Sequence, residues 1–360
     1  MKSLGFAIIG CGRIAGHHMR ALRELPGARL VAICDLIPER GKAYQQEFSV
    51  PWYDNYHTLL RREDVDVVSI LTPNGMHPSH AIDIMNRYAK HVVVEKPLAL
   101  KLNDLPEMQS AARRAGVKVF PVFQNRYNKA VCRVNQAITG GELGRLSLGS
   151  IRLRWCRTQP YYERDAWRGT WALDGGALVN QGIHYLDLLL HFMGEVESAC
   201  AMTATRLVDI EVEDVAVAQL RFTNGALGNI EVTTATRPKD IEASVSVLGE
   251  HGTAVLGGIA SNRLEVWTLN PEDRDRCSEE FPDAYGFGHR LLLADVIADL
   301  SGGPPHPISF YEGSRSVQLL NALYRSAEDK MPVFMKDKPV SRRLGEYVPD
   351  LYRLYESLPP

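Results

Sequence analysis

Short, wholly apolar runs recur through the first third of the chain and alternate with stretches of helical periodicity. Runs of this kind are typical of strands buried on both faces of a parallel sheet. The predicted strands cover residues 6–9, 30–34, 66–71, 91–94 and 117–123. The predicted helices include one that ends near residue 25 and two more at residues 78–88 and 102–115. This alternation predicts an α/β fold with a doubly wound parallel sheet.

The pattern changes after residue 143, where apolar and polar residues begin to alternate one by one. Such alternation is typical of antiparallel strands with one solvated face. It recurs at residues 146–154, 212–222, 226–234, 242–248, 253–256 and 263–267. Asn224-Gly225 is a strong hairpin signal between two of these strands. Helical patterns follow at residues 288–300 and 311–327, so we predict an α+β domain with a large, mostly antiparallel open sheet.

The predicted domains are therefore residues 1–124, residues 125–340 and a helical tail at 341–360. A chain of 360 residues also exceeds the roughly 250–300 at which a single core stops growing. The formal net charge is −2 and no long block of like charge occurs, which argues against a nucleic-acid or membrane surface.

Cysteine usage and the amino terminus indicate a cytoplasmic protein. The six cysteines show no CxxC pairing, so we expect reduced thiols and neither a metal site nor a disulfide framework. The first residues enter an apolar strand at once, without the pattern of a secretory signal. No apolar run reaches the ~18 residues that a membrane span requires.

The first strand runs into Gly10-Cys-Gly12-Arg-Ile-Ala15, a G-x-G-x-x-A motif between a strand and a helix. In this context the glycines permit a tight turn and close approach of a pyrophosphate, and the helix amino terminus attracts its charge. Asp35 ends the second strand about 20 residues later, where a carboxylate would accept the ribose hydroxyls. The motif predicts a Rossmann domain that binds NAD. The alternative for Asp35 is a helix cap for the segment at Pro38.

Unusual polar residues stand at the ends of three further strands: Thr72-Pro73-Asn74, Glu95-Lys96-Pro97 and Gln124-Asn125-Arg126. Ligands bind beyond the carboxyl ends of parallel strands, so these residues should lie along the edge that carries the glycine loop. Because side chains alternate along a strand, Glu95 and Lys96 should point to opposite sides. The alternative is a solvated charge pair at the start of a loop.

A second polar cluster lies on the predicted helix near residues 180–191. Asn180, His184, Asp187 and His191 follow at i, i+4, i+7 and i+11, which places them on one helix face. This face has two histidines and no lysine or arginine, which is unusual for a solvated surface. We therefore weigh a site-facing role for His184 equally with simple solvation.

Together these motifs resemble the glucose–fructose oxidoreductase / inositol dehydrogenase family of nicotinamide-dependent sugar oxidoreductases. The resemblance rests on the glycine motif, Thr72-Pro-Asn74-x-x-His77, Glu95-Lys96-Pro97 and Gly182-Ile-His184-Tyr-x-Asp187. It implies a sheet that mediates oligomers, often dimers of dimers, and a cis bond before Pro97. It also implies that Lys96 and His184 are the catalytic residues. The family commonly has aspartate where this chain has Asn180, and an amide cannot raise the pKa of a histidine by charge.

The resemblance and the strand ends together give the candidate site residues. The expected cofactor-binding residues are Gly10, Gly12, Arg13, Ile14, Ala15, Asp35, Thr72, Pro73, Asn74, His77, Glu95, Lys96 and Gln124. The expected substrate-binding residues are Lys96, Asn125, Arg126, Tyr127, Arg164, Trp167, Arg168, Asn180, Gln181, His184 and Tyr285.

Within the family, the segments around Trp167–Trp171 and Tyr285–His289 are similar to the UDP-N-acetylglucosamine / UDP-N-acetylglucosaminuronate 3-dehydrogenase branch. This similarity implies oxidation at C3 for amino-sugar and polysaccharide biosynthesis, including lipopolysaccharide, by a homotetramer. Arginines match diphosphate oxygens and aromatic rings stack on a base or sugar, although such a loop also serves subunit assembly. The alternatives are an inositol or free-sugar dehydrogenase of the same family and a non-catalytic NAD-binding regulator.

Overall fold

The computed structural model describes residues 3–357, and the chain divides into two compact units. The first unit contains the chain up to Val122 together with His289–Ser314 and the segment from Tyr347. The second unit contains Phe123–Gly288 and Arg315–Glu346. The first boundary lies close to the predicted one at residue 124. The later boundaries differ from the prediction, because two segments of the carboxy-terminal part of the chain pack with the first unit.

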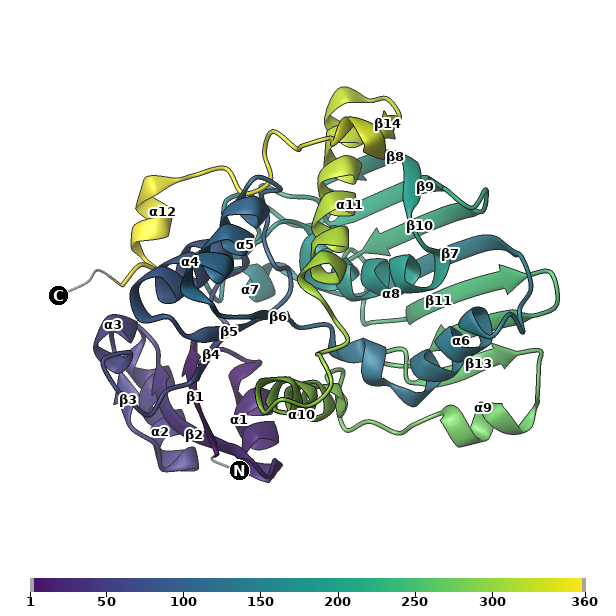
Figure 1. Cartoon of the computed structure of the whole chain (residues 1–360). Helices are drawn as coiled ribbons and strands as arrows, with labels where there is room; N and C mark the ends of the chain where they lie inside the picture. The colour runs from purple at the N-terminus through teal and green to yellow at the C-terminus, as the bar shows by residue number, and fades with distance from the viewer. Residues whose placement is uncertain (1–2, 358–360) are drawn as a thin grey trace. The chain divides into compact units, whose positions relative to one another are not determined.

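The first unit is built on a six-stranded sheet in the order β3-β2-β1-β4-β5-β6 (Figure 1). Every pairing in this sheet is parallel. The strands are β1 (Leu4–Ile9), β2 (Ala28–Cys34), β3 (Trp52–Tyr53), β4 (Val67–Ile70), β5 (His91–Val94) and β6 (Val119–Pro121). The chain crosses from the β2 side of β1 to the β4 side, and the crevice at such a reversal is where ligands of this fold bind.

The helices of the first unit are α1 (Ala15–Glu24), α2 (Pro38–Phe48), α3 (Tyr56–Leu59), α4 (His77–Tyr88), α5 (Asp104–Ala115), α10 (Gly288–Leu300) and α12 (Pro349–Arg353), with a short turn of helix at η1 (Asn74–Met76). The residues of β4 are all fully buried, as the apolar run predicts. The last strand, β6, is shorter than the predicted 117–123. It lies at the edge of the sheet, and Pro121 has no N–H with which to extend the ladder.

The second unit is built on an eight-stranded sheet in the order β13-β12-β11-β7-β10-β9-β8-β14. Its strands are β7 (Leu146–Arg154), β8 (Val196–Ala204), β9 (Val215–Phe222), β10 (Leu227–Thr233), β11 (Glu242–Gly249), β12 (Thr253–Gly257), β13 (Arg263–Trp267) and β14 (Val333–Phe334). Among the described strands of this sheet, only β7 and β10 pair in parallel. This confirms the predicted mostly antiparallel sheet.

The turn between β9 and β10 forms at Asn224-Gly225, as predicted. Gly225 has a φ of +88°, a conformation that only glycine adopts without strain. The Asn224 side chain accepts a hydrogen bond from the Ala226 N–H at 3.0 Å and so closes the turn. Local turn chemistry therefore sets the register of this hairpin.

Helices cover one face of the second sheet, where α8 packs against β7 and β11. The helical elements are η2 (Gln124–Tyr127), α6 (Lys129–Thr139), α7 (Gln159–Tyr162), the π-helix η3 (Leu178–Gly182), α8 (Ile183–Met193), α9 (Glu272–Cys277), α11 (Phe310–Asp329, in this unit from Arg315) and η4 (Met335–Asp337). The apolar side chains of Met202, Val217 and Leu227 remain exposed on β8, β9 and β10.

All six cysteines are free thiols. Among the described residues, no helix is both long and apolar enough to cross a bilayer.

Candidate functional site

The glycine loop between β1 and α1 has the geometry of a phosphate cradle. Gly10 has a φ of +95°, and a Cβ on it would lie 2.6 Å from the Leu71 carbonyl oxygen. A Cβ on Gly12 would meet nothing within 4 Å, so its backbone is open to close approach. No side chain caps the first turn of α1, so no side chain competes with an anion for the positive end of this helix. These features fit a dinucleotide pyrophosphate.

Asp35 at the end of β2 also braces this loop. Its Oδ2 accepts a hydrogen bond from the Cys11 N–H at 2.6 Å, and its Oδ1 accepts one from the Ile37 N–H at 2.8 Å. The second bond is a local turn contact before α2, whose N-cap Ile37 has no side-chain cap hydrogen bond, so Asp35 is not the helix cap considered as its alternative. An ionised carboxylate has about four acceptor positions, so it can hold the loop and still accept ribose hydroxyls.

His77 joins the loops that follow β4 and β5. Its ring is buried, with Nδ1 2.7 Å from the Pro97 carbonyl oxygen and Nε2 2.9 Å from the Thr72 carbonyl oxygen. Burial lowers the pKa of His77, and the two carbonyl acceptors oppose this shift. Asn74 is buried in the same loop, and the peptide bond between Lys96 and Pro97 is cis, as the resemblance implies. The role of His77 seen here is to fix two strand-end loops together.

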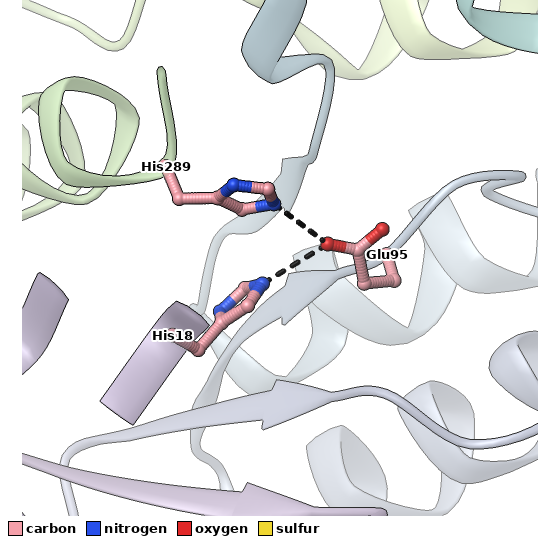
Figure 2. A group of neighbouring side chains, drawn as sticks. All are labelled: His18, Glu95 and His289. Carbon is pink, nitrogen blue, oxygen red and sulfur yellow. Dashed lines mark hydrogen bonds and ion pairs between the residues drawn. The ribbon is translucent and has the colours of Figure 1, made fainter. Parts of the chain in front are cut away.

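Glu95 belongs to a buried cluster that the sequence did not reveal. His18 on α1 donates a hydrogen bond from Nε2 to Glu95 Oε1 at 3.0 Å (Figure 2). The Nε2 atom of His289, near the start of α10, lies 3.4 Å from the same oxygen. Burial alone would raise the pKa of Glu95, but the two histidines outweigh it and hold that pKa well below its ordinary value. Glu95 is therefore an ionised carboxylate that ties three elements together.

The same cluster bears on metal binding. Among the residues that the structure describes, His18, Glu95 and His289 form the one group whose ligand atoms lie close enough to hold a metal ion, within 4.8 Å of one another. Direct histidine–carboxylate interactions already account for this arrangement. The absence of a resident metal stays a prediction.

Lys96 differs from Glu95 in burial, as the alternation of side chains along a strand predicts. Glu95 is buried and Lys96 is half-buried at the end of β5.

In the second unit, the buried amides Gln124 and Asn125 each have a side-chain oxygen without a hydrogen-bond partner in the described part of the chain. Buried polar atoms without partners often mark a ligand that completes the site.

Arg126, expected to contact substrate, forms a buried ion pair with Asp187 of α8. Its Nε lies 2.8 Å from Oδ2 and its Nη2 lies 2.7 Å from Oδ1, a bidentate arrangement. The two side chains are 7% and 2% exposed. Asp187 is therefore not on a solvated helix face, and Arg126 has at least a structural role.

The segment before α8 is a π-helix, Leu178–Gly182, which changes the predicted helix face. The extra residue per turn shifts Asn180 relative to His184. Asp174 accepts hydrogen bonds from the Asn180 side-chain amide and, at 2.7 Å, from the Gly169 N–H. His184 is half-buried in the first turn of α8. The Asn180 amide is thus oriented by a carboxylate that lies six residues earlier.

Arginine and aromatic side chains form a cluster around Tyr161. The Arg168 guanidinium lies 4.8 Å from the Tyr161 ring centroid and 4.5 Å from that of Trp167, and it donates to the Tyr161 hydroxyl at 2.9 Å. Gln181 of the π-helix donates to the same hydroxyl at 3.3 Å. Arg164 is exposed above the ring, 6.0 Å from its centroid. These contacts hold the side chains of the cluster in place. A fixed cluster suits either substrate binding or subunit assembly, the two roles considered for this loop.

The remaining expected residues lie in or next to helices of the structure. Arg13, Ile14 and Ala15 follow the glycines into α1, Tyr127 ends η2, and Tyr285 is half-buried in the segment before α10. Sequence reasoning missed His18, His289 and a buried pair, Glu213 and Tyr324. His18 lies on the buried face of α1, which was the one available signal.

Models of one protein family match both units. The family described as "Oxidoreductase family, NAD-binding Rossmann fold" (GFO/IDH/MocA) matches residues 4–123. The GFO/IDH/MocA C-terminal domain matches residues 131–255. Together these matches cover most of the chain.

Solved structures and curated proteins agree with this match. The WlbA dehydrogenase from Bordetella pertussis, in complex with NADH and UDP-GlcNAcA, is 39% identical with a TM-score of 0.88, over 92% of this chain and 98% of that one. The WlbA dehydrogenase from Chromobacterium violaceum, with the same ligands, is 36% identical with a TM-score of 0.86, over 93% and 96%. The myo-inositol 2-dehydrogenase of Thermotoga maritima is 27% identical over 340 residues, 92% of this chain and 98% of that protein.

Proposed function

Since the chain belongs to the GFO/IDH/MocA family of NAD-binding oxidoreductases, we propose that it oxidises a ring hydroxyl of a UDP-linked N-acetylated amino sugar or its uronate, with C3 favoured. The chain is an NAD-dependent dehydrogenase of this family. The observation that carries the choice of substrate is the braced cluster of Arg168, Tyr161 and Trp167. Planar guanidinium groups match diphosphate and carboxylate oxygens, and rings beside them stack on a base or sugar.

The proposed chemistry divides the work between the cofactor and the side chains. A bound NAD+ would supply the acceptor for the hydride that leaves the carbon bearing the reacting hydroxyl. Lys96, half-buried at the end of β5, takes the hydroxyl proton as the general base. His184 orients the hydroxyl or serves as a second base. The loop from Gly10 to Ala15 would hold the pyrophosphate, and Asp35 would accept the ribose hydroxyls.

The product of this reaction is a keto sugar still linked to its nucleotide. A ketone at C3 is the substrate that an aminotransferase needs, so the proposal places the protein in amino-sugar and polysaccharide biosynthesis, including that of lipopolysaccharide. The free thiols of the chain are in keeping with the proposed cytoplasmic location.

The test compares substrates at fixed NAD+ by the absorbance of reduced nicotinamide. We expect UDP-N-acetylglucosamine or its uronate to exceed glucose, myo-inositol and scyllo-inositol by at least about 100-fold in kcat/KM, because two charge-assisted contacts of about 1.5 kcal/mol each give that ratio. UDP alone should compete with the nucleotide sugar. The highest kcat/KM with an unphosphorylated polyol would replace this proposal with the inositol or free-sugar dehydrogenase alternative.

We predict a preference for NAD+ over NADP+ of at least about tenfold in kcat/KM, since Asp35 would repel a 2′-phosphate by more than about 1 kcal/mol. Asp35→Asn keeps one acceptor for the loop and removes the charge, so it should narrow the preference. Glu39→Gln, which removes an acid from the first turn of α2, is the control and should change nothing. Equal kinetics of the wild type with both cofactors would contradict this role of Asp35.

We predict that His184→Asn lowers kcat more than Asn180→Ala does. Only the histidine can exchange a proton near neutral pH, and such a group contributes about 10²–10⁴-fold. Steady-state kinetics on both variants provide the measurement. If Asn180→Ala were the more damaging change, the amide held by Asp174 would be the more important positioning group.

We propose a homotetramer assembled through the exposed face of the second sheet. Met202 is 70% exposed there, and Val217 pairs with it on the neighbouring strand. Sedimentation at micromolar concentration should give a tetramer that Met202→Glu weakens. Leu207→Glu, at an exposed residue outside the strands, is the control. A wild-type monomer under these conditions would contradict the assembly.

A further inference from the structure

Glu213 is a buried carboxylate that lies outside the predicted catalytic residues. It is 2% exposed. Its Oε1 accepts a hydrogen bond from the Leu178 N–H at 2.9 Å, and its carbonyl oxygen accepts one from the Ala177 N–H at 3.1 Å. Both donors belong to the entry of the π-helix at Leu178–Gly182. One residue on the segment before β9 therefore holds two successive backbone groups at the start of that helix.

Tyr324 on α11 holds the same carboxylate from a third element. Its hydroxyl donates to Glu213, with oxygen–oxygen distances of 2.9 Å and 3.1 Å, and accepts a hydrogen bond from the Gly176 N–H at 3.2 Å. A Cβ on Gly176 would lie 1.8 Å from Glu213 Oε2, so only glycine lets the backbone come this close. The backbone from Gly176 to Leu178 is thus fixed at three consecutive N–H groups.

The electrostatics of this pair follow from the same contacts. The pKa of Glu213 is raised to about 7, chiefly by burial and to a smaller extent by Asp174, although the donors from Leu178 and Tyr324 lower it. The charge on Glu213 therefore depends on those donors. The Glu213 carboxylate accepts hydrogen bonds from both the π-helix and α11, so its ionisation is linked to the contacts of both elements.

The anchored segment carries residues that the proposed function uses. A π-helix has poorer geometry than an α-helix and persists where surrounding contacts hold it, frequently at functional sites. Asn180 and Gln181 lie within it, and His184 follows in the first turn of α8. A shift at the entry of the helix would move all three side chains together.

We propose that Glu213 and Tyr324 are positioning residues, which fix the π-helix and through it the orientation of Asn180, Gln181 and His184. Neither residue touches the reacting atoms in this proposal. It rests on the proposed function only in that Asn180, Gln181 and His184 are taken to act on substrate. The contacts by which Glu213 and Tyr324 hold the π-helix do not depend on which substrate is bound.

Two variants weaken the anchor and one matched variant spares it. Glu213→Gln keeps an acceptor for Leu178 but cannot ionise, and Tyr324→Phe removes the hydroxyl that bridges Glu213 and Gly176. Ser326→Ala is the control. Ser326 is a fully buried residue on α11 whose hydroxyl accepts a hydrogen bond from the Ala201 N–H and donates one to the Met331 carbonyl oxygen, and both partners lie outside the π-helix.

The first readout is hydrogen exchange followed by mass spectrometry on the full chain. Both anchor variants should lose protection in the peptides that span residues 176–184, while Ser326→Ala should not. The second readout is steady-state kinetics with the nucleotide sugar. Both anchor variants should lower kcat about 10- to 100-fold, the size expected for a misplaced catalytic group, and leave the KM for NAD+ within twofold.

The outcomes separate failure of this inference from failure of the proposed function. Unchanged exchange at residues 176–184 in both anchor variants overturns the inference. Changed exchange with undiminished kcat overturns it as well, because the anchor would then be structural only. If the wild type does not oxidise a nucleotide sugar, the proposed function fails, and kinetics with whichever family substrate is turned over, read with the exchange data, decide on the anchor.

Discussion

Replacing Lys96 with methionine is expected to lower kcat by about 10²–10⁴-fold, the usual contribution of a positioned general base. Methionine keeps the length and the apolar stem of lysine and removes the amine that takes the proton. The dissociation constant of NADH should stay within a few-fold, because the glycine loop and Asp35 would hold the cofactor independently. Single-turnover kinetics and calorimetric NADH binding measure the two quantities.

Lys101→Met is the matched control for this experiment. Lys101 is a half-buried lysine in the loop that follows Lys96, so its loss changes the local charge by the same amount. Its kcat should remain close to that of the wild type. A Lys96→Met enzyme within a few-fold of the wild type would remove Lys96 from the role of base and leave His184 as the candidate.

Replacing Asp187 with alanine is expected to lower the free energy of unfolding by about 3–5 kcal/mol. The reason is the bidentate pair with Arg126, in which both side chains are almost wholly buried. Without its partner the guanidinium would remain in a poorly solvated position with no carboxylate to balance it. Urea unfolding followed by fluorescence measures the change.

A double variant separates the stability of this pair from the predicted substrate contact. Asp187→Leu combined with Arg126→Leu removes both charges and should recover most of the stability lost in Asp187→Ala, since well-packed apolar residues often replace a buried pair. If Arg126 also binds substrate, the KM of the double variant for the nucleotide sugar should rise. Full stability of Asp187→Ala would show that the pair does not hold α8.

The elements of both sheets follow closely from the sequence because their signals are local. The apolar run at 66–71 yields β4, and the alternation at 146–154 yields β7 with the predicted bounds. The turn at Asn224-Gly225 is determined by these two residues themselves. The division into two units could not be predicted from the sequence. The sequence of α10 contains no local signal that shows which of the two cores the helix packs against.

The candidate sites divide in the same way. The glycine loop and Glu95-Lys96-Pro97 were predictable, because each motif requires its residues in one short stretch. The partners of Glu95 were not, as His18 and His289 come from distant positions and meet it only through the fold. The π-helix also escaped prediction. It depends on Glu213 and Tyr324, which lie some 35 and 146 residues from its start by sequence number.

The discontinuous first unit has a consequence for how the chain is made. His289 belongs to the same unit as Glu95, yet it leaves the ribosome almost two hundred residues later. Until then α10 is missing, so that of these two histidines only His18 is present to pair with the Glu95 carboxylate. A fragment that ends near residue 124 would remain in that state permanently. The first unit therefore receives α10 only after residues 123–288 of the second unit have been synthesised.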